Sequence, residues 1–399
     1  MGPTHENADA TADRDRLEAL RVAAVEQLNL LDTPGEERFD RITRIARELF
    51  GVPIAEINLI DDHRQYTKSP QPGGVAGSVP LADSFCELTV RQPDIIVVPD
   101  ATQDDRFSGR SAVSDERHVR FYAGRPLSID NENRVGTLCL VDTTPRTFSA
   151  EQQRLLDELG DWVERELQET ADLDRAAEWQ QKLLPHTQPS WPDYEVAGVC
   201  LPAKTVAGDF YAWYGTGTDI EVTLADVMGK GTAGAILAAA VRAAFQSRTG
   251  IDVVEAITQV DRQLADDLDD TASFATLVHA RLDVASGRLE YADAGHGLTL
   301  VVRADGTSER LRATGLPIGI LSGGTWTRGE TVLEPGDRLI TFTDGLLDLY
   351  DGTLDSLDRI TELVVAADSP AATIAAISAL VAEGDPDDDV SAVVLTRRA

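Results

Sequence analysis

Four aspartates in the C-terminal half stand at the ends of apolar, strand-like runs. They are Asp209 in VAGDFYAWY, Asp226 in VTLADVMGKG, Asp344 in LITFTDGLLD and Asp388 in DDVSAVVL. Strand ends hold carboxylates on a rigid frame, and a neighbouring glycine lets backbone carbonyls approach closely. Mg²⁺ and Mn²⁺ prefer oxygen ligands, and two such ions roughly 3.5–4 Å apart can activate a water for attack on phosphorus. The pattern favours a metal site, although a lone aspartate in so acidic a chain is usually a surface residue.

Two other residues in this half offer weaker chemistry. His296 in DAGH could act as a general acid, but a histidine that organises a turn is the more common finding. Lys230 lies in Gly-Lys-Gly, which lacks the spacing and the Ser or Thr of a P-loop, so a phosphate contact and a plain turn both remain open. The sequence has no Ser/His/Asp or Cys/His nucleophile motif.

Apolar runs rich in β-branched residues predict the strands that must position the aspartates. They are EVAGVCLPA, DIEVTLADVM, FATLVHARLD, RLEYADAG, LTLVVRADG, RLITFTDG and VSAVVLTR. Helical patterns intervene at 231–248, 251–268 and 370–383. Many neighbouring strands with few helices predict an antiparallel sandwich with helices packed outside it.

A long helix is predicted before this region, over residues 149–185. Ser149 and Gln152 form a capping-box start, apolar residues recur every three to four positions, and Pro185 ends the pattern. A helix of about 36 residues would be about 54 Å long, which is too long for one small domain to cover. We interpret it as a connector and dimerisation helix; the alternative is two helices separated near Thr170.

The N-terminal half has the pattern of a sensor-sized α+β domain. Residues 1–16 are polar and acidic and are expected to be flexible. Helical patterns cover 17–31 and 39–51, and strand-like runs cover 52–61, 94–100 and 135–142. Three widely spaced cysteines, Cys86, Cys139 and Cys200, form no CxxC pair and are interpreted as buried core thiols; a redox or chromophore site at Cys86 and Cys139 is the alternative.

The net charge of −32 excludes some classes of partner. It argues against nucleic acid and against an anionic membrane surface. The sequence lacks an apolar run long enough for a transmembrane helix and lacks a secretory signal, so a cytoplasmic protein is expected. Only four of the 36 basic residues are lysines, which fits either a high-salt environment or biased codon usage with ordinary acidity.

Residues 186–399 resemble the PPM family of metal-dependent protein phosphatases, in the bacterial branch of sporulation and stress-response sigma-regulator (RsbU-like) enzymes. The resemblance lies in the order of the motifs LLP, PAKTVAGDFY, DVMGKG, FATL, YADAGH, LPIGI, LEPGDRLITFTDG and DDV. It implies an α/β-β/α sandwich and the hydrolysis of phosphoserine or phosphothreonine by a metal-activated water, without a phosphoenzyme.

Carried over by position, the resemblance implies two divalent ions, Mn²⁺ or Mg²⁺. The implied ligands are Asp209, Asp226, Asp344, Asp388 and the Val227 carbonyl, with Asp226 as the bridging residue. Asp389 is an open alternative to Asp388. The sequence departs from the family at Ala212, where a second aspartate is common, and at Ala207, which replaces a glycine. These changes put one metal position in doubt.

Residues 17–148 resemble a GAF domain, a sheet with helices on one face and a small-molecule pocket on the other. The residues that carry this are LNLLDTPGEERFDRITRIA, SFCELTV, VVPDATQDDRF, RFYAGRPL and GTLCLVDTTPRTFSAEQ. Phe121, Tyr122 and Arg125 could line such a pocket or simply pack. The ligand is not readable, and a purely structural GAF domain remains an alternative.

Together these features predict a homodimeric, GAF-regulated serine/threonine phosphatase in residues 186–399. By resemblance its substrate is a phosphorylated STAS-type anti-sigma-factor antagonist. The alternative is a degenerate phosphatase fold that binds its partner without turnover, for which Ala212 is the support in the sequence.

Overall fold

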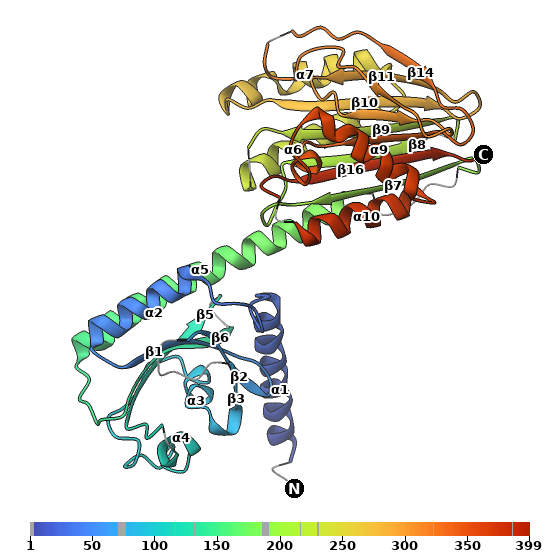
Figure 1. Cartoon of the computed structure of the whole chain (residues 1–399). Helices are drawn as coiled ribbons and strands as arrows, with labels where there is room; N and C mark the ends of the chain where they lie inside the picture. Colours follow the sequence, from blue (N-terminus) through green and yellow to red (C-terminus); the bar gives the residue numbers. More distant parts are fainter. Residues whose placement is uncertain are drawn as a thin grey trace. The chain divides into compact units, whose positions relative to one another are not determined.

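The computed structural model describes residues 4–70, 77–115, 117–130, 133–185, 191–215, 217–229, 231–321, 323–384 and 386–399, with side chains from residue 15 onward. The chain forms two compact units, Met1–Asp174 and Arg175–Ala399 (Figure 1). Among the described residues, no helix has both the length and the apolar character that crossing a bilayer requires.

A six-stranded antiparallel sheet forms the centre of the first unit. Its strands are β1 (Ile54–Ile60), β2 (Arg64–Ser69), β3 (Gly77–Pro80), β4 (Ile96–Val98), β5 (Phe121–Ser128) and β6 (Arg134–Asp142). Their order in the sheet is β3-β2-β1-β6-β5-β4. The predicted strands 52–61, 94–100 and 135–142 are therefore confirmed as β1, β4 and β6.

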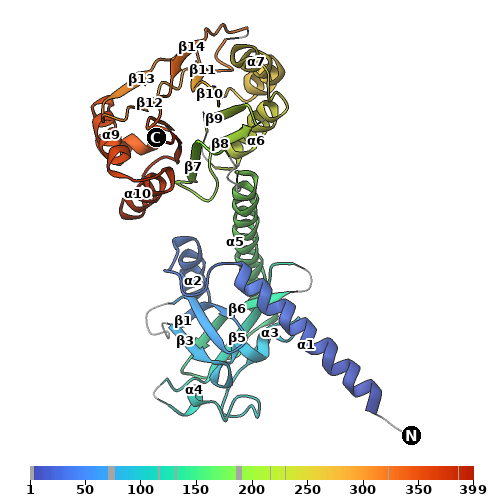
Figure 2. The same cartoon turned by 90° about the vertical axis from the view of Figure 1, so that its right-hand side faces the viewer.

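Helices cover both faces of this sheet. One face packs against α1 (Thr4–Gln27), α2 (Glu37–Phe50) and the first part of α5 (Ala150–Leu183) through a core that includes Phe39, Leu138 and Leu156. The other face carries the 3-10 turn η1 (Leu81–Asp83) and the short helices α3 (Cys86–Val90) and α4 (Ser111–Ser114) (Figure 2). Successive side chains on a strand point to opposite faces, so each strand of the sheet serves both layers.

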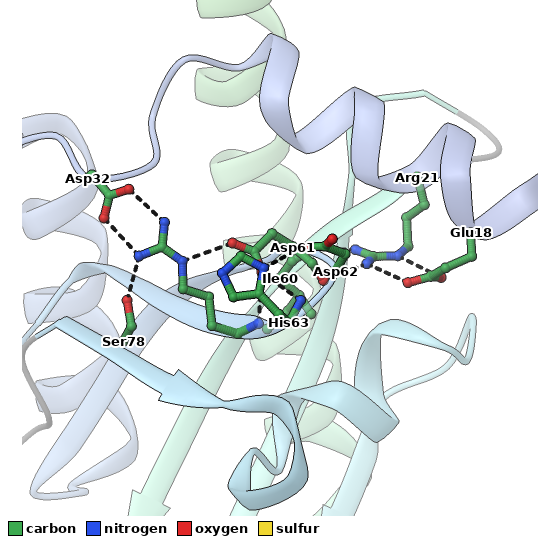
Figure 3. A network of polar contacts seen from close by, with 9 residues as sticks. Glu18, Arg21, Asp32, Ile60, Asp61, Asp62, His63 and Ser78 are labelled. Carbon is green, nitrogen blue, oxygen red and sulfur yellow. Dashed lines mark hydrogen bonds and ion pairs between the residues drawn. The ribbon is translucent and has the colours of Figure 1, made fainter.

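Helix α1 begins at Thr4, inside the segment 1–16 that the sequence predicts to be flexible. Residues 4–16 contain no proline or glycine, so nothing in them stops a helix from extending N-terminally. Arg21 connects α1 to the sheet by hydrogen bonds. Its guanidinium donates to the backbone oxygens of Ile60 and Asp61 at 2.5 and 3.0 Å and pairs with Glu18 (Figure 3).

The β1–β2 turn is held by a second arginine. Arg64 donates to Asp61 and Asp32, each at 2.9 Å, and to Ser78 on β3 at 2.9 Å (Figure 3). These contacts join the turn to the loop before α2 and to the neighbouring strand. The carboxylate oxygens of Asp61 therefore accept hydrogen bonds from within the fold.

Helix α5 is continuous from Ala150 to Leu183, as the connector interpretation requires. The predicted capping box is present: the Ser149 hydroxyl accepts from the Gln152 backbone N–H at 3.1 Å, and the Gln152 side chain accepts from the Ser149 N–H at 2.9 Å. A break near Thr170 is excluded, because the Thr170 hydroxyl bonds to the Glu166 carbonyl within the helix. The division between the units falls inside α5, so the helix belongs to both.

Two five-stranded antiparallel sheets build the second unit. One has the order β14-β11-β10-β9-β8 and the other β13-β12-β15-β16-β7. The strands are β7 (Tyr194–Leu201), β8 (Asp209–Gly215), β9 (Asp219–Val227), β10 (Ala275–Asp283), β11 (Arg288–Ala294), β12 (Thr299–Val302), β13 (Ser308–Leu311), β14 (Gly329–Val332), β15 (Arg338–Phe342) and β16 (Val390–Arg397).

Helices lie on the outside of the sandwich. Helices α6 (Thr232–Gln246) and α7 (Val253–Asp270) pack on the first sheet, and α9 (Leu357–Ala366) and α10 (Pro370–Glu383) pack on the second (Figure 2). The short α8 (Gly345–Asp348) and η2 (Leu354–Ser356) precede α9. The predicted sandwich is confirmed. The sequence patterns missed α9 and the edge strands β13 and β14. The two strands have four residues each and are too polar for a period to appear.

Candidate metal centre

Asp209 and Asp226 face each other across two neighbouring strands. Asp209 is the first residue of β8 and Asp226 the last but one of β9, and the two are direct cross-strand partners. Directly opposed residues of an antiparallel pair have Cβ atoms about 4.5–5.5 Å apart. The register therefore brings together two carboxylates that are separated by the whole β8–β9 hairpin in sequence.

Thr343 connects this pair to the other sheet. Its hydroxyl donates to Asp209 Oδ2 at 2.8 Å and accepts from the backbone N–H of Ser391 at 2.9 Å. Thr343 directly follows β15 and precedes Asp344, and Ser391 is the second residue of β16, three positions after Asp388. The sandwich thus brings the strand ends that carry all four predicted aspartates to one place.

Asp388 and Asp389 have different surroundings. The Asp389 carboxylate is buried and accepts two backbone N–H groups, from Ala203 at 2.8 Å and Gly208 at 2.7 Å. It therefore holds the loop that leads into Asp209. Asp388 instead lies close enough to Asp344 for their charges to interact. Of the two alternatives that the sequence left open, Asp389 occupies the supporting position and Asp388 the position facing Asp344.

Like charges and burial shape the acidity of this cluster. Burial and the nearby Asp226 hold the pKa of Asp209 well above its usual range. Burial and the nearby Asp388 likewise raise the pKa of Asp344. A divalent cation would offset both effects, because its charge stabilises the ionised carboxylates. The donor set, which consists of oxygens only, fits Mg²⁺ or Mn²⁺.

Gly208 allows the backbone to approach the cluster closely. A Cβ on Gly208 would lie 2.8 Å from the Val227 carbonyl oxygen and 2.9 Å from the Gly229 carbonyl oxygen, and no side chain fits at those distances. Val227, the predicted carbonyl ligand, directly follows Asp226. Its carbonyl therefore lies beside the loop that leads to Asp209.

The four aspartates lie as two neighbouring pairs, Asp209 with Asp226 and Asp344 with Asp388. Among the residues that the structure describes, only Asp61, Asp62 and His63 bring three possible ligand atoms within 4.8 Å. That trio lies in the β1–β2 turn of the first unit, where Asp61 is already hydrogen-bonded to His63 and Arg64 backbone groups. It is a turn structure whose other two side chains are exposed.

Ala212 does not touch the metal centre. It lies three residues after Asp209 on β8, and an odd offset places its side chain on the opposite face. That face packs under α6, and Ala212 is 1% exposed. The Ala212 side chain therefore lies on the face of β8 away from Asp209.

His296 is buried in a turn rather than poised for proton transfer. Its backbone N–H donates to Asp293 at 2.8 Å, and its Nε2 lies 3.2 Å from the Thr341 hydroxyl. Burial lowers the pKa of its imidazole to about 4. The interpretation as a turn-organising histidine is favoured. Cys200 is buried in β7, as predicted, and Lys230 lies outside the described residues.

Sequence reasoning missed Gln180, on the last turns of α5. Its side-chain amide makes two hydrogen bonds to the backbone of Ala207. Nε2 donates to the Ala207 oxygen at 2.7 Å, and Oε1 accepts from the Ala207 N–H at 2.9 Å. Ala207 stands two residues before Asp209. The end of the predicted connector helix is thus bonded to the loop that supports the metal centre.

A cavity of about 400 Å³ opens in the first unit, on the face of the sheet that carries α3 and α4. Tyr122 lines it. Phe121 points to the opposite face and packs in the core beneath α5, because adjacent strand residues alternate. Arg125 pairs with Asp157, Asp161 and Glu164 of α5. Of the three residues suggested for a sensor pocket, Tyr122 lines this cavity, whereas Phe121 and Arg125 pack on the α5 side of the sheet.

Comparison with known families agrees with both halves of the fold. Residues 216–398 match the family described as Stage II sporulation protein E (SpoIIE), and residues 34–195 match the GAF domain family. The segments that match these two families are those whose motifs resemble a GAF domain and a SpoIIE-type phosphatase domain.

Individual relatives match only parts of the chain. Phosphoserine phosphatase RsbU of Bacillus subtilis is 28% identical over 179 residues, which are 44% of this chain and 53% of that protein. Cyclic di-GMP phosphodiesterase PA2567 of Pseudomonas aeruginosa is 37% identical over 135 residues, covering 34% of this chain and 23% of that protein. This chain spans about half or less of the length of the curated relatives it matches.

Among solved structures, the RsbU and RsbW domains of Rv1364c from Mycobacterium tuberculosis are similar. The sequence identity is 27% and the TM-score is 0.47, with 53% of this chain and 64% of that chain covered.

Proposed function

We propose that this chain is a metal-dependent protein phosphatase that hydrolyses phosphoserine or phosphothreonine on a small regulatory protein. The observation that carries the proposal is the in-register pair Asp209–Asp226, joined through Thr343 to the strand ends that bear Asp344 and Asp388. The match to the SpoIIE family supports the same reaction class.

The five predicted ligand groups would hold two divalent ions. Bound there, the ions would supply charge neutralisation for the phosphoryl group and an activated water. The chain's own residues provide the frame. Thr343 orients the Asp209 carboxylate, Asp389 holds the loop before it, and Gly208 keeps space for the Val227 carbonyl. The substrate proposed from the motifs is a phosphorylated STAS-type anti-sigma-factor antagonist, and the likeness to a phosphoserine phosphatase is consistent with it.

The test is hydrolysis of p-nitrophenyl phosphate and of a phosphoserine-bearing STAS-domain protein by the full chain. We expect turnover of both with Mn²⁺ or Mg²⁺, and loss of turnover with EDTA that returns when metal is restored. Turnover that survives chelation contradicts the metal role. If the chain hydrolyses the small ester but not the phosphoprotein, the proposed substrate class is wrong and the phosphatase reaction stands.

Helix α5 is the proposed route of regulation from the GAF domain. Its first turns pack in the core of the first unit, and Gln180 near its end holds Ala207 in the second. Exposed Trp179 and Leu183 on α5 and Ile236 on α6 leave an apolar surface beside this contact. A second copy of the chain would bury such a surface, which supports the proposed homodimer.

We expect Gln180→Ala to raise the Mn²⁺ concentration for half-maximal activity by about 10-fold, since groups that support metal ligands are typically worth 10–100-fold in affinity. Activity is measured against Mn²⁺ concentration, with circular dichroism as the check on folding. Glu178→Ala is the matched control, because Glu178 is exposed and pairs with Lys182 on the same helix. Equal metal dependence in both variants would show that α5 does not support the metal loop.

A further inference from the structure

The cavity of the GAF domain contains two thiols. Cys86 begins α3 and Cys139 lies in β6, and both side chains line the cavity although each is only 2% exposed. The remaining wall combines apolar residues, such as Phe85 and Val119, with the charged Glu56, Asp83 and Arg117. A cavity of about 400 Å³ holds a small organic molecule as well as water. Small uncharged molecules that enter it meet both sulfurs.

The two sulfurs are neighbours. The Cys86 and Cys139 thiols lie close enough for each to shift the pKa of the other. Asn58 Nδ2 on β1 donates to both, at 3.6 Å to Cys86 Sγ and 3.1 Å to Cys139 Sγ. Asn58 is itself fixed by the Thr67 hydroxyl, which donates to its Oδ1 at 2.8 Å. Three elements therefore converge to hold residues that are 53 positions apart in sequence with their sulfurs side by side.

The surroundings distinguish the two thiols. The Tyr122 hydroxyl donates to Cys86 Sγ at 3.6 Å and lies 2.7 Å from the Thr89 hydroxyl. Burial opposes ionisation of Cys86, but the neighbouring Cys139, Thr137 and Tyr122 side chains outweigh it and lower the pKa of the Cys86 thiol. The interaction with Cys86 and burial raise the pKa of Cys139. The thiolate is the reactive form of cysteine, so Cys86 is the better nucleophile.

We propose that Cys86 and Cys139 are a redox-active pair that a small hydroperoxide, entering the GAF cavity, oxidises to an intramolecular disulfide. Nothing in this inference rests on the phosphatase activity of the second unit. It assigns the cavity a class of reactant, a peroxide, and gives the two cysteines different roles.

The reaction balances with the hydroperoxide as the oxidant. Cys86 sulfur attacks one peroxide oxygen: an S–O bond forms, the O–O bond breaks, and the leaving alkoxide takes the Cys86 proton to become an alcohol. Cys139 sulfur then attacks the Cys86 sulfenic acid: the S–S bond forms, the S–OH bond breaks, and the departing hydroxide takes the Cys139 proton to become water. Two thiols lose two electrons, and the hydroperoxide gains them.

The test counts thiols in the full chain after exposure to hydrogen peroxide or tert-butyl hydroperoxide. Samples are denatured, alkylated and digested, and each cysteine is followed by mass spectrometry. We expect a Cys86–Cys139 cross-linked peptide, with both thiols lost at least about 10-fold faster than Cys200, since reactivity follows thiolate character and access. Cys200 is an internal control because it is buried in β7 and does not line the cavity.

Two variants separate the roles. In Cys139→Ser, Cys86 should accumulate as a sulfenic acid that dimedone traps, and in Cys86→Ser, Cys139 should stay reduced. Cys200→Ser should form the disulfide at the wild-type rate. Loss of all three thiols at one rate, disulfides only between chains, or no cross-linked peptide at peroxide concentrations that oxidise Cys200 would each overturn the proposal.

Discussion

Replacing Asp226 or Asp344 by Asn should abolish metal-dependent turnover while leaving the fold intact. Asp226 faces Asp209 across the β8–β9 ladder, and Asp344 stands near Asp388. An amide keeps the size of the side chain but removes the negative charge that a divalent cation requires. Even supporting partners of metal ligands are worth about 10–100-fold, so we expect a loss in kcat/KM of at least about 100-fold.

The measurement is hydrolysis of p-nitrophenyl phosphate with saturating Mn²⁺, beside thermal unfolding without metal. Unfolding without metal should occur at the wild-type temperature or above, because each change removes one of several repelling carboxylates. Asp219→Asn is the matched control: it lies at the other end of β9 and pairs with Arg281 at 3.0 Å. Full activity in both Asp226→Asn and Asp344→Asn would remove these residues from the reaction.

Loss of the Asp389 carboxylate should lower stability, whereas loss of the Asp388 carboxylate should lower turnover. Asp389→Ala leaves the N–H groups of Ala203 and Gly208 without their acceptor, in a site where Gly208 is buried. An unsatisfied buried group costs about 1–3 kcal/mol, so a loss of about 2–4 kcal/mol in the free energy of unfolding is expected. Asp388→Asn keeps the side chain's size and removes one ligand charge, so stability should hold while metal-dependent turnover is lost.

Chemical denaturation and Mn²⁺-dependent activity are measured on both variants. Asp389→Asn adds a third point: its amide offers one acceptor oxygen where the carboxylate offers two, so its stability should fall between wild type and Asp389→Ala. A stable Asp389→Ala with lost turnover, beside a fully active Asp388→Asn, would exchange the two assignments. This contrast separates a ligand from its support, which adjacent aspartates in a sequence do not reveal.

The strands and helices of both halves could be predicted from the sequence because apolar periodicity and capping depend only on residues a few positions apart. Ser149 and Gln152, three residues apart, form the capping box that predicts the start of α5. The apolar runs beside the four aspartates predict strand ends. The exposed edge strand β13 carried no such period, because three of its four residues face solvent.

The sequence predicted less well which face of a sheet each side chain lies on and which residues pair across strands. Phe121 and Tyr122 looked equally suited to a pocket, but their adjacent positions on β5 send them to opposite sides of the sheet. Ala212 looked like a defect in the metal centre until its odd offset from Asp209 placed it beneath α6. In both cases, residues that are neighbours in sequence lie on different faces of a sheet.

By itself, then, the sequence determined the two domain families, the long helix between them and the four strand-end aspartates, because short motifs and their order encode these directly. Only the tertiary structure decided that Asp209 pairs with Asp226 and that Asp389 supports the loop before Asp209. It also decided that Gln180 bonds to Ala207 and that Cys86 lies beside Cys139. Each of these contacts depends on strand pairing or helix docking between distant segments, and such packing is set by the whole core rather than by any local pattern.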